Sequence, residues 1–140
     1  MDISHWAVKQ ALENAQNAVT YFKIGPNLLR RTGNSFRMAA IIFKGKKLIS
    51  EGVNNTRSYS KLKPEHVPFM RFPDSIHAEF DAIVGTDSSL DRSTLVVIRT
   101  NRFNQLLLAK PCKKCEQLIG LTGIRNVWYS ISSYPYLEKL

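Results

Sequence analysis

The chain has 140 residues, of which 44% are hydrophobic and 22% charged, and this composition is typical of a globular domain. It argues against an intrinsically disordered chain, and only two cysteines exclude a disulfide-rich secreted domain. The formal net charge is +9, and residues 1–70 carry +7 of it. This imbalance favours a partner that bears phosphate, although a plain solubilising surface is the alternative.

The N-terminal residues contain an acid at Asp2 and no apolar stretch after a basic start, so we expect no secretory signal. No apolar run approaches the roughly 18 residues of a membrane span, and we expect no association with membranes. We therefore predict a single domain over residues 1–140 with reduced thiols. Its expected location is the cytoplasm, or the host cytoplasm if the protein is viral.

The first half of the chain predicts a helix, a hairpin and a long loop. Residues 3–22 have apolar side chains at three- and four-residue spacings and predict an amphipathic helix that ends at Gly25-Pro26. Two apolar runs, 36–43 and 47–53, flank a short glycine turn and predict a β-hairpin. Residues 54–75 contain three prolines and predict a lid or binding loop.

The second half alternates between helices and strands. Residues 76–85 predict a helix that ends at glycine, and residues 95–99 predict a buried strand. Pro111 is expected to open a short helix with Gly120 as its cap, and residues 126–131 predict a further strand. This order predicts an α/β layered domain with helices packed on a mixed sheet.

Two short segments supply three side chains that favour zinc. One segment contains His77, and the other contains Cys112 and Cys115. Structural zinc sites use four protein ligands, whereas catalytic sites use three and leave the fourth position to water. The three residues therefore favour a catalytic site, with His66 of the long loop as an alternative fourth ligand. A redox pair of cysteines is another alternative, but it leaves the histidine without a role.

The surroundings of these residues suggest hydrolytic chemistry. Cys112 follows Pro111 at a predicted helix start, beside Lys113 and Lys114, and this positive environment predicts a lowered thiol pKa. Glu79 lies two positions after the histidine, near enough to reach a water on the metal and to pass its proton to a leaving group. Such an arrangement is suited to hydrolysis at an electrophilic carbon with loss of an amine.

The combination of His77-Ala78-Glu79 with a later Pro-Cys-x-x-Cys at 111–115 resembles the signature of the cytidine/deoxycytidylate deaminase superfamily. The chain is most similar to the small phage-type deoxycytidylate deaminase-like proteins. Residues 35–40 with 52–54 are similar to the family's first hairpin, and residues 76–83 to its His-x-Glu helix. Residues 109–115 with 123–124 and 127–130 are similar to its second zinc helix and the following strand. The resemblance implies a cytidine-deaminase-like three-layer α-β-α sandwich with a mixed central sheet, one Zn²⁺ per chain and a homo-oligomer.

The resemblance also implies roles for the motif residues. His77, Cys112 and Cys115 would bind zinc. Glu79 would take a proton from the zinc-bound water, protonate ring N3 and then protonate the departing ammonia. The backbone N–H of Ala78 would hydrogen-bond the base carbonyl.

Further substrate contacts are expected outside the zinc motif. Asn54 matches the asparagine that contacts the sugar, although a plain turn residue is the alternative. Arg57 and Lys61 of the long loop are expected to bind a nucleotide phosphate, unless the loop is only a solvated surface. Tyr129 and Tyr134, followed by Tyr136, are candidates for an aromatic contact with the substrate or for structural roles.

These observations predict a zinc-dependent enzyme that deaminates cytosine to uracil in a free nucleotide, with deoxycytidylate as the expected substrate. The first alternative is a cytosine deaminase that acts on single-stranded DNA or RNA, which the basic first half favours. The second is a catalytically inactive, zinc-stabilised binding module. Glu79 argues against the module, since a structural zinc site has no use for a carboxylate at the open metal position.

Overall fold

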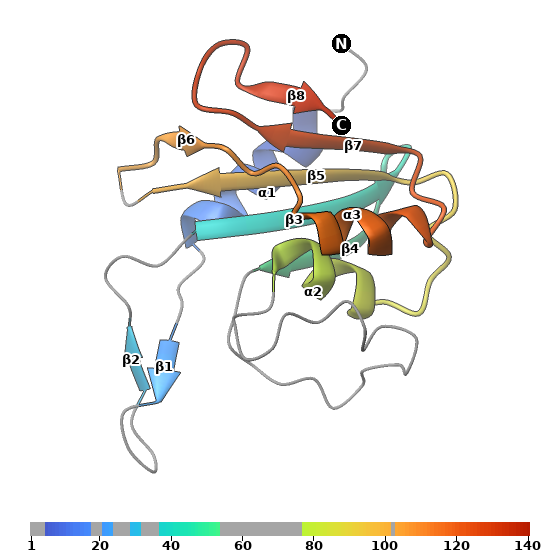
Figure 1. The fold of residues 1–140 in the computed structure, drawn as a ribbon, viewed down its shortest axis with the longest axis horizontal. Coiled ribbons are helices and arrows are strands. Elements are labelled where there is room, and N and C mark those ends of the chain that lie inside the picture. Colours follow the sequence, from blue (N-terminus) through green and yellow to red (C-terminus); the bar gives the residue numbers. More distant parts are fainter. Residues whose placement is uncertain (1–4, 18–20, 24–28, 32–36, 54–76, 102) are drawn as a thin grey trace.

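The protein is represented by a computed structural model that describes residues 5–17, 21–23, 29–31, 37–53, 77–101 and 103–140. The described residues form a six-stranded sheet with helices on both faces (Figure 1), together with a separate two-stranded ribbon. Within these ranges, none of the helices has the length and apolarity needed to cross a membrane.

The six-stranded sheet is mixed, as the sequence predicts. Its strands are β3 (Arg37–Lys44), β4 (Lys47–Val53), β5 (Thr94–Thr100), β6 (Leu106–Leu107), β7 (Asn126–Ser130) and β8 (Leu137–Lys139). They lie in the order β4-β3-β5-β7-β8, and β6 pairs with β5. Strands β5 and β7 are parallel, whereas the other neighbouring pairs are antiparallel.

Three helices cover the sheet: α1 (His5–Asn17), α2 (Ala78–Val84) and α3 (Lys113–Gly120). Successive side chains of β5 point to opposite faces, so the strand contributes to two cores. Leu95 and Val97 pack in one core with α2 and α3, and Val96 and Ile98 pack in the other with α1. Figure 1 shows α1 on one side of the sheet and the other two helices on the opposite side. The predicted three-layer α-β-α architecture is therefore confirmed.

The N-terminal helix is shorter than predicted. It ends at Asn17, and Tyr21–Lys23 instead form strand β1, which pairs antiparallel with β2 (Leu29–Arg31). The sequence Thr20-Tyr21-Phe22 is β-branched and aromatic, and such residues favour strands over helices. The apolar spacing within the helix is confirmed, because its alanines Ala7, Ala11 and Ala15 are all buried.

The central hairpin is confirmed, since β3 and β4 pair antiparallel around a turn in which Gly45 has a positive φ of 62°. The boundaries of α3 differ from the prediction. Cys112 is the N-cap, so Pro111 precedes the helix rather than opening it, and the helix continues through Gly120 to a cap at Leu121. Strands β6 and β8 were not predicted, because two or three residues are too few to show a clear periodicity.

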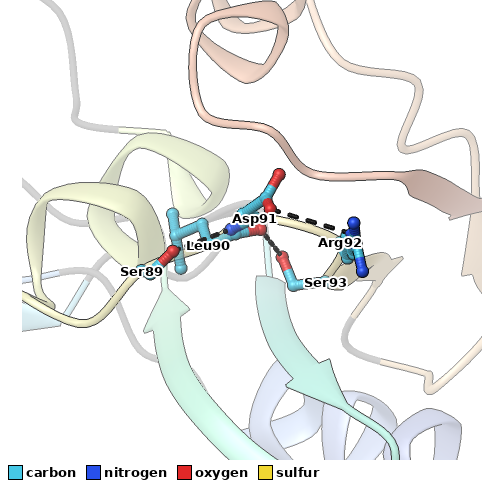
Figure 2. Close-up of polar contacts among 5 residues, drawn as sticks. All are labelled: Ser89, Leu90, Asp91, Arg92 and Ser93. Carbon is cyan, nitrogen blue, oxygen red and sulfur yellow. Dashed lines mark hydrogen bonds and ion pairs between the residues drawn. The ribbon is translucent and has the colours of Figure 1, made fainter.

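The turn over residues 89–93, drawn in Figure 2, directly precedes β5. It lies at the opposite end of the strands from Val53, because Thr94 pairs with Phe43 whereas Val53 pairs with Ala39. Within it, the buried Ser93 hydroxyl donates a hydrogen bond of 2.5 Å to the Leu90 carbonyl. The Ser93 carbonyl accepts a hydrogen bond of 2.8 Å from the Arg125 amide, just before β7. This turn therefore aligns the beginnings of the two parallel strands.

Candidate metal centre

Two helix N-termini hold the three predicted metal ligands. His77 is the N-cap of α2, and Cys112 is the N-cap of α3. Each keeps an extended backbone conformation while its carbonyl accepts the first helical hydrogen bond, from Asp81 and from Glu116 respectively. Neither side chain forms a capping hydrogen bond with its own helix. Cys115 lies in the first turn of α3 and is buried.

The spacing of the three donor atoms fits a tetrahedral zinc ion. Nδ1 of His77 lies 3.6 Å from Sγ of Cys112 and 3.6 Å from Sγ of Cys115, and all three ligand atoms lie within 4.8 Å of one another. With Zn–N of about 2.0–2.1 Å and Zn–S of about 2.3 Å, tetrahedral ligands of these two kinds lie about 3.6 Å apart. The nitrogen donor thus lies at the distance from each sulfur donor that a tetrahedral zinc ion requires.

Glu79 lies beside this triad, on the first turn of α2, and only 1% of its surface is exposed. Burial raises the pKa of its carboxyl group, and hydrogen bonds from its own backbone and from Cys115 offset only part of this effect. Its Oε1 is buried without a hydrogen-bond partner among the described residues. A buried carboxylate oxygen without a partner is costly, so the site suits a ligand that supplies a proton donor there.

The surroundings of the Cys115 thiol act on its pKa in the direction opposite to the lowering that the sequence predicts at the helix start. Its pKa is raised, mainly by burial and then by the negative charges of Glu79 and Cys112. The neighbouring Lys113 and Lys114 are exposed to solvent and do not offset these effects. A divalent metal would act in the opposite direction, because it binds the thiolate form of cysteine and compensates the negative charge that burial disfavours.

Ala78 occupies the first position of α2 and is fully buried between His77 and Glu79. The first backbone N–H groups of a helix have no acceptor within the helix. The N–H of Ala78 is therefore suited to bind a polar atom of a ligand at this end of α2.

The predicted aromatic contacts differ in their surroundings. Tyr129 belongs to the core between the sheet and the helices α2 and α3, and its hydroxyl donates a hydrogen bond of 2.9 Å to Glu138. It therefore has a structural role in β7. Tyr134 is 85% exposed and forms an edge-to-face pair with Tyr136 at a centroid distance of 6.1 Å.

The remaining predicted contacts lie outside the described residues. They are the proposed sugar ligand, the proposed phosphate ligands and the alternative fourth metal ligand: Asn54, Arg57, Lys61 and His66.

Contacts between β4 and α2 were not anticipated from the sequence. Gly52 lies against the backbone of α2 at Ala78 and Ala82, and the Val53 amide donates a hydrogen bond of 2.8 Å to Asp81. The one available signal was the glycine itself, since a glycine inside a strand often marks a close approach of another backbone.

Comparisons with known proteins agree with this geometry. The family model of the cytidine and deoxycytidylate deaminase zinc-binding region matches residues 2–131. The dCMP deaminase of cyanophage S-TIM5 in apo form has 21% sequence identity and a TM-score of 0.57, over 92% of this chain and 82% of that chain. The same enzyme in complex with dCMP and dUMP has 22% identity and a TM-score of 0.56, over 88% and 76% of the two chains. At these identities the likeness shows a shared fold. No curated protein sequence matches the chain significantly.

Proposed function

Because this chain belongs to the cytidine and deoxycytidylate deaminase family, we propose that it hydrolyses the amino group of cytosine in a free nucleotide, with dCMP as substrate. The reaction consumes water and yields dUMP and ammonia. The observation that carries this proposal is the position of Glu79, which is buried beside a three-ligand metal site and has an oxygen without a partner among the described residues.

His77, Cys112 and Cys115 would hold the zinc ion. When bound, zinc lowers the pKa of a water ligand to about 7 and so supplies hydroxide at neutral pH. Glu79 would accept one proton of the attacking water and deliver it to ring N3, and would then carry the second proton of that water to the amino group, which leaves as ammonia. The raised pKa of its carboxyl group suits this role, since an acid–base catalyst works best with a pKa near the working pH.

Substrate orientation would depend on the residues around the start of α2. The Ala78 N–H would donate to the base carbonyl, Asn54 would contact the sugar, and Arg57 and Lys61 would bind the phosphate. Support for dCMP in particular comes from the similar cyanophage enzyme, which binds dCMP and dUMP. The net charge of +9 is also consistent with an anionic substrate.

Ammonia release from zinc-loaded protein tests this proposal. We expect release with dCMP, and less with deoxycytidine, which lacks the phosphate. Glu79→Gln should retain zinc but lose turnover by at least about 100-fold, because general acid–base catalysis contributes that much or more. Full activity of Glu79→Gln, or no ammonia from dCMP with wild type, would contradict it.

A cytosine deaminase acting on single strands is the second candidate. Tyr134 is 85% exposed and Phe103 68% exposed, and exposed aromatic side chains can stack on unpaired bases. Binding to a cytosine-containing oligonucleotide at increasing salt tests this function, since contacts with the phosphate backbone weaken steeply with salt. No binding at low salt would eliminate it.

A further inference from the structure

Strand β5 changes its neighbour along one edge, close to the chain that leads to α3. Its other edge pairs with β3 from Thr94 to Thr100. On the edge away from β3, β7 pairs with β5 as far as Val97, whereas β6 pairs with it at Arg99 and Thr100. Figure 1 shows β6 and β7 on the same side of β5. The two strands β6 and β7 therefore separate at this end of β5.

Ser130, the last residue of β7, joins the strands at this branch point. Its side chain is fully buried, and its hydroxyl accepts a hydrogen bond of 3.0 Å from the Arg99 amide and donates one of 2.6 Å to the Leu107 carbonyl. Its carbonyl accepts a third bond, of 2.9 Å, from the Ala109 amide. One residue thus holds β5, β6 and the chain after β6. A buried network whose members are satisfied makes such a junction rigid.

The chain held at the branch point leads directly to the cysteine ligands. Ala109 is buried in the core that includes α2 and α3, and Cys112 is the N-cap of α3 three positions later. Between them, the buried Pro111 has a fixed φ and restricts the backbone of Lys110. This short connection has little freedom, so a displacement of Ala109 would be passed on to Cys112. Cys115 would move as well, since it lies in the first turn of the same helix.

We propose that Ser130 is a positioning residue for the metal site. Its hydroxyl would fix the start of α3, and with it the position of Sγ of Cys112 relative to Nδ1 of His77. The inference rests on the metal centre of the proposed function and does not depend on which nucleotide is deaminated. It predicts that the loss of one hydroxyl that is not a metal ligand changes both zinc affinity and the geometry of the ligands.

Ser93 offers a matched control at the other end of β5. It is also fully buried, and its hydroxyl also donates a hydrogen bond to a backbone carbonyl, that of Leu90 (Figure 2). Ser93 directly precedes β5, whereas Ser130 binds Arg99 near the end of that strand. Ser93→Ala therefore removes the same group from a similar environment, away from the chain that enters α3.

The test measures zinc affinity by competition with a chelator. Ser130→Ala should lower the affinity about tenfold, the lower end of the range for residues that orient metal ligands. It should also shift the visible absorption of Co²⁺ bound in place of zinc, because this absorption depends on ligand geometry. Ser93→Ala should keep the wild-type spectrum and an affinity within about threefold of wild type, although both variants lose a buried hydrogen bond. If Ser130→Ala does not fold, Ser130→Cys takes its place, because a thiol is a weak donor.

Equal zinc affinity in Ser130→Ala and Ser93→Ala, or an unchanged Co²⁺ spectrum in Ser130→Ala, would overturn the role of Ser130. Ammonia release from dCMP separates this result from a failure of the proposed function. If wild type binds zinc but releases no ammonia, the proposed function fails, and Ser130 is still judged by zinc affinity and the Co²⁺ spectrum. If wild type binds no zinc, both proposals fail.

Discussion

Gly52 of β4 lies against the carbonyl group of Ala78, the residue that follows the metal ligand His77. A Cβ at position 52 would overlap with that carbonyl and with the Ala82 amide, and would lie 2.9 Å from the Ala82 Cα. These atoms are backbone, so they cannot move aside as the end of a flexible side chain can. The absence of a side chain at Gly52 therefore determines how closely α2 approaches the sheet.

Gly52→Ala should displace α2 and disturb the metal site. We expect zinc affinity to fall at least about tenfold and the free energy of unfolding to fall by about 2–3 kcal/mol, as in other overpacked sites. Competition with a chelator and urea denaturation measure the two effects. Gly120→Ala is the control, because nothing lies within 4 Å of its added Cβ and alanine favours the helix. Equal zinc affinity in both variants would contradict the prediction.

Zinc should stabilise the fold through the three ligands. Free zinc at about 100 times its dissociation constant should add about 2.7 kcal/mol to the free energy of unfolding, and a chelator should remove this gain. His77→Ala should abolish the response, since it removes one of the three donor atoms. His5→Ala is a matched control because His5 is an exposed histidine on α1. A thermal-denaturation response that persists in His77→Ala would exclude this metal site.

The metal site could be predicted because its signals are local. His77 and Cys112 each lie where the sequence predicts a helix start. Imidazole and thiolate are typical zinc ligands, and this inference does not depend on the tertiary structure. The pKa of Cys115 could not be predicted in the same way. Its shift comes mainly from burial and from Glu79, and both depend on tertiary packing.

Pairings between distant residues were also beyond the sequence patterns. The hydrogen bond from the Val53 amide to the Asp81 carboxylate joins residues 28 positions apart, and neither residue type indicates that the two would pair. Strand β8 has only three residues and becomes a strand by pairing with β7. The larger elements were predictable because apolar periodicity over seven or more residues reports which face of a helix or strand is buried.

The hydrogen bond from Tyr129 to Glu138 predicts a dependence of stability on alkaline pH. It raises the tyrosine pKa above 10.0, so the folded state holds this proton more tightly than the unfolded state. The resulting stability is complete below about pH 10 and is lost as pH rises through the folded pKa. Tyr129→Phe lacks the bond and should be about 1 kcal/mol less stable near neutral pH.

Urea denaturation of wild type and Tyr129→Phe at about pH 8 and about pH 11 tests this dependence, since tyrosine titrates near pH 10. The difference between the two proteins should shrink at the higher pH. The other tyrosines titrate equally in both proteins and therefore cancel. A difference that stays constant or grows would show that the hydrogen bond does not set the tyrosine pKa.

Gly123 offers a test of fold stability that is separate from the metal site. It has a positive φ of 82°, and an added Cβ would lie 2.9 Å from Oδ1 of Asp91, in the turn before β5 (Figure 2). Gly123→Ala should lower the free energy of unfolding by about 1–2 kcal/mol, because alanine is strained in this conformation. Zinc affinity should not change, since the turn before β5 and the end of β4 lie at opposite ends of the strands. If Gly123→Ala lowered zinc affinity as much as Gly52→Ala, a change at one end of the strands would affect the metal site at the other end. The effect of Gly52→Ala could then not be assigned to its contact with α2.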